Sequence, residues 1–130
     1  MMDNKLHYRT LWLGIGWTYI GFIFFVSLMP QPPMLHVTYF DKLSHFTAYA
    51  VAMAWFIQLY SNQLTRIYYA LAFVCMGIGI EFLQGLSGQR MFEYADMLAN
   101  SLGVTCALFM VKGVSARMLW HIEQRLIRQA

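Results

Sequence analysis

The sequence predicts an all-α membrane protein, a bundle of four transmembrane helices with a C-terminal amphipathic helix. Of its 130 residues 59% are hydrophobic and only 12% are charged, whereas an ordinary soluble domain has about 25% charged residues. The apolar residues also form long blocks, rather than one face of a helix or alternate positions of a strand. We therefore expect residues 1–130 to form a single membrane domain.

The first apolar block, 11–29, contains no charged residue. As a helix it would be roughly 28 Å long, close to the hydrocarbon thickness of a bilayer. Pro30, Pro32 and Pro33 follow it, and proline ends a helix because it lacks the N–H donor and has a fixed φ. We predict a membrane-spanning helix here and an irregular connection over 31–40.

The second and third blocks are also predicted to span the membrane. In the second, 41–60, the ionisable residues all fall in the first two turns. The third, 67–86, carries a single charged residue, Glu81, and we expect Gly85 and Gly88 to break its helix. Both blocks are long enough to cross a bilayer.

A fourth span and a tail complete the predicted layout. Polar turns are expected at 61–66 and 89–95. The fourth span, 96–112, is short, so the charged residues at its ends should lie near the two interfaces. In the tail, 115–129, basic and polar side chains alternate with apolar ones at helical spacing, which predicts a helix lying on the membrane surface.

The distribution of basic residues predicts the orientation. If both termini share one side, seven of the nine Lys and Arg residues lie on that side, which places both termini in the cytoplasm. The net charge of +3 is spread along the flanks of the spans and not gathered on one element, so we expect no nucleic-acid partner. The second and fourth spans carry small residues at four-residue spacing, which allows close backbone contact between membrane helices and predicts a compact bundle: Ala48, Ala50, Ala52, Ala54, Ala99, Gly103 and Ala107.

The same topology gathers the polar residues of the spans at the outward-facing end. Ionised groups within a span are costly and usually pair inside the bundle. We expect His45, Glu81, Arg90 and Asp96 to form one contiguous cluster, with Arg90, Lys42 or His45 as the cationic partner of Glu81. Taken singly, the aspartates could instead cap helices, the lysine could lie at the interface, and the amides could link helices.

The polar residues form an ordered motif that reads Asp41-Lys42-x-x-His45-Phe46 with Tyr49, Glu81-x-x-Gln84, then Arg90-x5-Asp96-x3-Asn100-x2-Gly103. This motif resembles the VanZ-like family of small bacterial membrane proteins. The resemblance covers 41–107, where Ala107 replaces a frequent glycine. It implies a place in the bacterial cytoplasmic membrane, with the site at the outer leaflet, and a link to envelope function or teicoplanin-type glycopeptide resistance.

Two functions follow as hypotheses. In the first, the outward pocket binds an anionic membrane lipid, a lipid-linked cell-wall precursor or a lipoglycopeptide, with Lys42 and Arg90 contacting phosphate or carboxylate. The predicted ligand-binding residues are Lys42, His45, Glu81, Gln84, Arg90, Asp96 and Asn100.

In the second, the protein is an enzyme acting on a phosphate or glycosyl lipid, with His45 as base or nucleophile and Asp41 or Glu81 orienting it. No GxSxG, HExxH or P-loop motif supports catalysis. His45, Glu81 and Asp96 could make a metal site of nitrogen and carboxylate ligands, but spacing does not test three ligands on three separate helices. The sequence therefore predicts neither a metal nor another cofactor.

Overall fold

The structure, a computed structural model, describes residues 6–30, 38–88 and 90–129, and these contain helices but no strand. The all-helical class is thus confirmed. The elements are α1 (Arg9–Leu28), α2 (Thr38–Leu59), α3 (Gln63–Ser87), α4 (Tyr94–Met110), the short 3-10 helix η1 (Ser115–Arg117) and α5 (Met118–Gln129).

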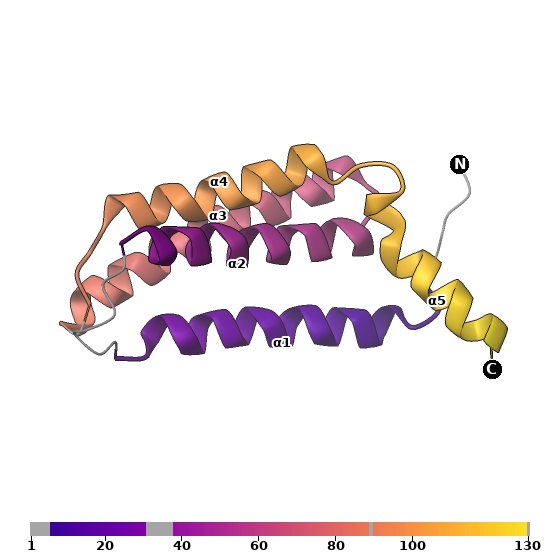
Figure 1. The fold of residues 1–130 in the computed structure, drawn as a ribbon, viewed down its shortest axis with the longest axis horizontal. Helices are drawn as coiled ribbons and strands as arrows, with labels where there is room; N and C mark the ends of the chain where they lie inside the picture. The colour runs from indigo at the N-terminus through magenta and orange to yellow at the C-terminus, as the bar shows by residue number, and fades with distance from the viewer. Residues whose placement is uncertain (1–5, 31–37, 89, 130) are drawn as a thin grey trace.

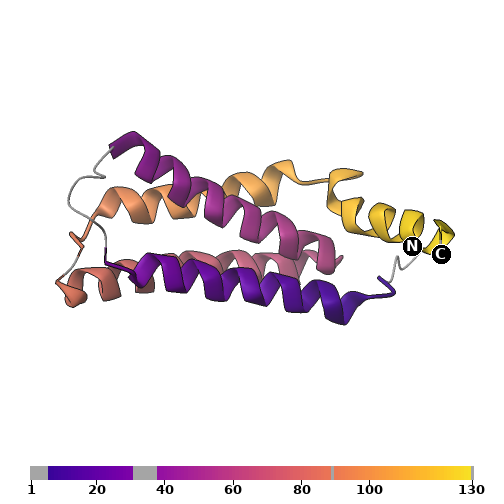
Figure 2. The ribbon, with the colours of Figure 1, turned by 60° about the horizontal axis from the view of Figure 1, so that its bottom comes forward.

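The four long helices run side by side, and α5 extends from the end of the bundle where α1 begins (Figures 1 and 2). The closest helix pair is α2 and α4. The carboxyl ends of α1 and α3 and the amino ends of α2 and α4 lie together at the opposite end of the bundle. The predicted alternation of helix direction is therefore present.

Two of the described helices, α1 and α3, are long and apolar enough to cross a membrane. A third candidate is α4 together with the segment Ser115–Gln129, which is bent by 94° relative to it. Alone, α4 has only 17 residues, and polar side chains lower the mean hydropathy of α2. The structure thus supports two or three spans on length and composition, rather than the four that the sequence predicts.

Several helix boundaries differ from the prediction. Helix α3 begins at Gln63 and not at 67, because the Asn62 side chain accepts a hydrogen bond from the Leu64 N–H and caps the helix. It also continues through Gly85, which faces Phe92, and ends at Gly88, whose φ of 67° is typical of a helix C-cap.

Helices α2 and α4 also begin earlier in the sequence than predicted. Helix α2 begins at Thr38, within the predicted connection over 31–40, and residues 31–37 lie outside the described part of the chain. Helix α4 begins at Tyr94, two residues before the predicted span.

The apolar core is built around α2. Its Met53, Phe56 and Ile57 are almost fully buried, and the Phe56 ring meets the Phe73 ring of α3 edge-on at 5.2 Å between centroids. Large apolar side chains elsewhere point outward, among them Phe25 and Phe109, each 64% exposed. The bundle is therefore apolar on its surface as well as in its core.

Gly103 lets α2 and α4 approach closely. A Cβ at this position would overlap the backbone carbonyl oxygen of Phe46 and lie 3.1 Å from the Ala50 nitrogen. Since both atoms belong to the backbone of α2, neither can move without shifting the helix. The close contact that the small residues were expected to allow is therefore present here, and the structure identifies α2 and α4 as the pair.

We expect Gly103→Ala to lower the free energy of unfolding by about 1–3 kcal/mol, as overpacking of a tight contact does. Gly21→Ala and Gly79→Ala are matched controls, because a Cβ at either position meets nothing within 4 Å. These two should be neutral or stabilising, since alanine is the better helix former. Thermal unfolding in detergent measures all three; equal behaviour of the three variants would contradict the close contact.

A buried carboxylate joins α5 to the start of α1. Glu123 accepts hydrogen bonds from the backbone N–H groups of His7 at 2.6 Å and Tyr8 at 2.7 Å, and from Trp12 Nε1 at 3.0 Å. Burial favours a raised pKa, but these three donors outweigh it and lower the pKa of Glu123 below its ordinary value. Nothing in the sequence singled out Glu123, because its donors lie more than 100 positions away.

A carboxyl whose pKa is lowered by folding stabilises the folded state above its unfolded pKa, and this stabilisation disappears as the pH falls through the folded value. We expect Glu123→Gln to lower the melting temperature at pH 7, through a loss of roughly 1–3 kcal/mol of charge-assisted hydrogen bonding. The difference from the unsubstituted protein should shrink towards pH 3.

Arg125→Gln removes a charge from an exposed position of the same helix and serves as control. A pH-independent gap between Glu123→Gln and the unsubstituted protein would show that the carboxylate charge is unimportant.

Candidate functional site

The polar residues that the sequence grouped together meet at the end of the bundle where α2 and α4 begin (Figures 1 and 2). Four of them are buried: Glu81, Gln84, Asp96 and Asn100. The polar cluster consists of Asp41, Lys42 and His45 on α2, Glu81 and Gln84 on α3, Arg90 and Glu93 in the connection, and Asp96 and Asn100 on α4.

Lys42 lies at the centre of an ion network. Its ammonium group donates to Glu93 Oε2 and Asp96 Oδ1, and lies 3.7 Å from Asp41 Oδ2. Asp96 is almost fully buried, so Lys42 neutralises a charge that water does not reach. The carboxylate of Asp96 therefore pairs with a cation, in place of the capping role considered from the sequence.

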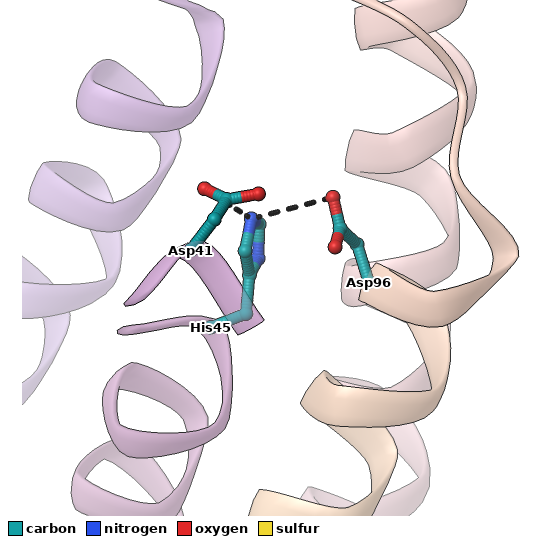
Figure 3. Close-up of side chains that lie close together, drawn as sticks. All are labelled: Asp41, His45 and Asp96. Atoms are coloured by element: carbon teal, nitrogen blue, oxygen red, sulfur yellow. Dashed lines mark ion pairs between the residues drawn. The ribbon is translucent and has the colours of Figure 1, made fainter. Parts of the chain in front are cut away.

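His45 stands between two aspartates and an amide. Its Nδ1 lies 3.1 Å from Asn100 Oδ1, and its Nε2 lies 3.8 Å from Asp41 Oδ1 and 3.7 Å from Asp96 Oδ2. Figure 3 shows the imidazole ring between the two carboxylates. Asp41 and His45 are four residues apart in α2, as Asp96 and Asn100 are in α4, so each pair lies on one face of its helix.

Glu81 makes its direct polar contact with the backbone. Its Oε1 accepts a hydrogen bond from the backbone N–H of Glu93 at 2.7 Å. Of the cations expected as its partner, Arg90, Lys42 and His45, none forms a direct ion pair with it in the described ranges, and His45 and Arg90 interact with it electrostatically at longer range. The Oε2 atom is buried without a hydrogen-bond partner in the described ranges, as is the hydroxyl of Tyr49.

Two side chains fasten the end of α1 to the cluster. Gln84 Nε2 and Arg90 NH1 donate to the backbone oxygen of Ser27, at 2.7 and 3.1 Å. The last carbonyl groups of a helix have no partner within it, so Ser27 is available to both donors. Arg90 NH2 also lies 3.7 Å from Asp41 Oδ1. The sequence had no signal for Ser27, because its contact is made by the backbone.

An open pocket of about 160 Å³ lies beside the cluster, between α1 and α2. Three members of the polar cluster line it: Asp41, His45 and Arg90. Much of the remaining wall is apolar, including Phe22 and Ile23 of α1. The pocket thus combines an apolar wall with a charged edge.

The predicted site residues divide into two groups. Lys42, Glu81, Gln84, Asp96 and Asn100 support the cluster without lining this pocket, whereas His45 and Arg90 do both. Asp41, which the sequence suggested as a catalytic candidate or a helix cap and not as a ligand-binding residue, also lines it. Glu93 belongs in the supporting group through its bond to Lys42.

A double-mutant cycle tests the Lys42–Asp96 pair. We expect Lys42→Ala and Asp96→Asn each to destabilise the protein, and the double variant to lose less than the sum, with a coupling of roughly 1–3 kcal/mol in unfolding experiments. The pair of Arg128→Ala and Asp96→Asn should be additive, because Arg128 is exposed on α5 at the far end. Additivity in both cycles would contradict the buried ion pair.

Comparison with known proteins finds one relative. An uncharacterized protein of Schizosaccharomyces pombe is 31% identical over 115 residues, which are 85% of this chain and 69% of that protein. No family model matches the chain. No solved structure matches it.

Proposed function

The chain belongs to the same family as the Schizosaccharomyces pombe protein, and from that premise and the geometry of the polar end we propose that it is a multi-pass membrane protein that binds an anionic lipid headgroup. The observation that carries the proposal is the pocket between α1 and α2. There the guanidinium of Arg90, together with Asp41 and His45, borders an apolar wall that includes Phe22 and Ile23.

The distribution of polar and apolar side chains supports the membrane. Leu71 of α3 is 57% exposed and Phe25 of α1 is 64% exposed, whereas Glu81 is 1% exposed. In water this arrangement would be unfavourable, since large apolar patches rarely face solvent. In a bilayer it is the favourable one, because lipid solvates the outer face and ionisable groups pair inside.

Within this proposal, the four helices α1 to α4 each cross the membrane, and both termini lie in the cytoplasm. Helix α2 carries its charges in its first turns, where they would lie near one interface, and it forms the core between the other helices. Helix α5 has apolar residues exposed along one side, among them Met118 and Leu126. It suits a surface position on the cytoplasmic leaflet, with Arg125 towards the headgroups.

Arg90 is the group we assign to the anionic headgroup. Its planar guanidinium has five N–H donors, and one hydrogen bond to Ser27 leaves others for a phosphate or carboxylate. Lys42 is less suited to this role than the sequence suggested, because three carboxylates surround its ammonium group. The apolar wall beside Arg90 would receive the first part of an acyl chain.

The resemblance to VanZ-like proteins suggests one set of ligands. It favours the outer leaflet of a bacterial membrane, with a lipid-linked cell-wall precursor or a lipoglycopeptide as ligand and glycopeptide resistance as a phenotype. The yeast relative is uncharacterized and names no ligand. An anionic phospholipid requires only the charged edge and the apolar wall of the pocket, and we therefore place it first.

An enzyme acting on a phosphate or glycosyl lipid is the second candidate. The hydrogen bond from His45 to Asn100 orients an imidazole at the pocket wall, as a general base requires. Turnover of a phospholipid by the purified protein, lost in His45→Gln, would favour catalysis over binding.

The test is lipid retention. We expect native mass spectrometry of the protein in mild detergent to show one tightly held phosphatidylglycerol and no equivalent phosphatidylcholine. Arg90→Ala should weaken this retention at least tenfold, because the guanidinium supplies the charge-assisted contacts. Arg128→Ala removes an exposed arginine of α5 and should leave the tightly held lipid in place. Equal retention by both variants would overturn the assignment of Arg90.

A further inference from the structure

Three metal-ligating side chains converge beside the pocket. One ligand atom each from Asp41, His45 and Asp96 lies within 4.8 Å of the other two. Figure 3 shows the two carboxylates on opposite sides of the imidazole ring. A tetrahedral zinc ion separates its nitrogen and oxygen ligands by roughly 3.3–3.6 Å. The His45 Nε2 distances of 3.7 and 3.8 Å to the two carboxylates are only slightly wider.

The hydrogen bond on the far side of the ring gives the tautomer. Nδ1 of His45 faces the carbonyl oxygen of Asn100, which accepts and does not donate, so Nδ1 carries the proton. Nε2 then presents a lone pair to two carboxylates that are too distant for hydrogen bonds. Metal-bound histidines are held in this way, with the second ring nitrogen donating to an oxygen acceptor.

The cluster also holds more acidic than basic side chains. Its carboxyl groups are those of Asp41, Glu81, Glu93 and Asp96, and its lysine and arginine are Lys42 and Arg90. Glu81 interacts electrostatically with Asp96, His45 and Arg90, and its Oε2 is buried without a partner in the described part of the chain. Carboxylate oxygens are common ligands of divalent metal ions.

We propose that Asp41, His45 and Asp96 bind a divalent transition-metal ion, with zinc as the best fit to one imidazole and two carboxylates. Three protein ligands leave a fourth position open for water or another oxygen donor. Since Asp41 and His45 line the pocket, the open position faces it. Lys42 contacts Oδ1 of Asp96 and leaves Oδ2 for the metal. Arg90 is too far from Asp41 for a hydrogen bond that the metal would have to displace.

The metal has a consequence for lipid binding, and this step rests on the proposed function. Without a further cation, the carboxylates of the cluster repel an anionic headgroup. A metal with an open position next to Arg90 gives the phosphate oxygen a second cationic partner. Metal binding itself stands on the geometry alone and does not depend on the lipid.

The experiment measures zinc on the full chain. The protein in detergent is stripped with chelator, dialysed against zinc and analysed by elemental mass spectrometry, with affinity determined by competition with a chromophoric chelator. We expect about one zinc per chain. Affinity should fall more than 100-fold in His45→Ala and in Asp41→Asn, and about 10–100-fold in Asn100→Ala, as loss of an orienting partner does.

His121→Ala is the matched control, because it removes an exposed histidine of α5; it should bind zinc like the unsubstituted protein. Thermal unfolding without metal verifies that each variant is folded, and Asp41, which is partly exposed, provides a ligand variant should His45→Ala fail to fold. Cobalt substitution adds a spectroscopic signature, an intense tetrahedral band that Asp41→Asn should abolish. Absence of stoichiometric zinc, or equal loss in His121→Ala, would overturn the site.

A second arm separates metal from lipid. Phosphatidylglycerol retention is measured with zinc and after chelation, and we expect at least a tenfold weakening without metal. Stoichiometric zinc with unchanged lipid retention would overturn the shared phosphate contact alone. Lipid retention that depends on Arg90 in a protein that binds no zinc would overturn the metal site and leave the proposed function intact.

Discussion

Ionised side chains are stable inside an apolar helix bundle only where opposite charges or hydrogen-bond donors meet them. The arrangement at the polar end of this bundle follows from that constraint. Lys42 joins Asp96 of α4 to Glu93 of the preceding connection, and Glu81 of α3 receives the backbone N–H of the same Glu93. These contacts link α2, α3 and α4 at the same end of the bundle, through charged side chains that no single helix could bury without a partner.

The same constraint explains why α1 leaves room for a pocket. Helix α1 packs against α2 less extensively than α4 does, and polar contacts fasten it near both ends. Gln84 and Arg90 donate to Ser27 at one end, and Trp12 donates to Glu123 and accepts from Trp55 at the other. Between these contacts the Tyr19 hydroxyl donates to the Ala48 carbonyl, and both residues line the pocket beside the charged residues.

The sequence predicted the helical class and the grouping of the polar residues, because both depend on patterns local to each helix. Long apolar blocks predicted the helices, and the alternating direction of successive helices placed the ends of separate helices next to one another. Contacts made by backbone groups have no corresponding pattern in the sequence. Almost every residue has a backbone carbonyl and an N–H, so these groups do not mark a position in the sequence. Only the fold reveals that Gln84 and Arg90 donate to the carbonyl of Ser27 and that Glu81 accepts from the N–H of Glu93.

The helix ends also combine features that the sequence predicts with features that depend on the fold. Asn62 extends α3 by one turn through a cap, and Gly85 lies within the helix, close to Phe92. The number of spans is harder to predict, since α2 is both the least exposed helix of the core and too polar to qualify by hydropathy. Its place in a membrane depends on its neighbours covering it.

In the proposed topology, the bundle crosses the membrane four times and its polar end lies at the outer face. Cysteine labelling in intact cells measures this directly, in a protein whose Cys75 and Cys106 are replaced by serine. Met91→Cys, at an exposed position of the polar end, should react with an impermeant thiol reagent, whereas Ser61→Cys, in the exposed turn at the opposite end, should react only after permeabilisation. Labelling of Ser61→Cys from outside, or equal labelling of both positions, would contradict this topology.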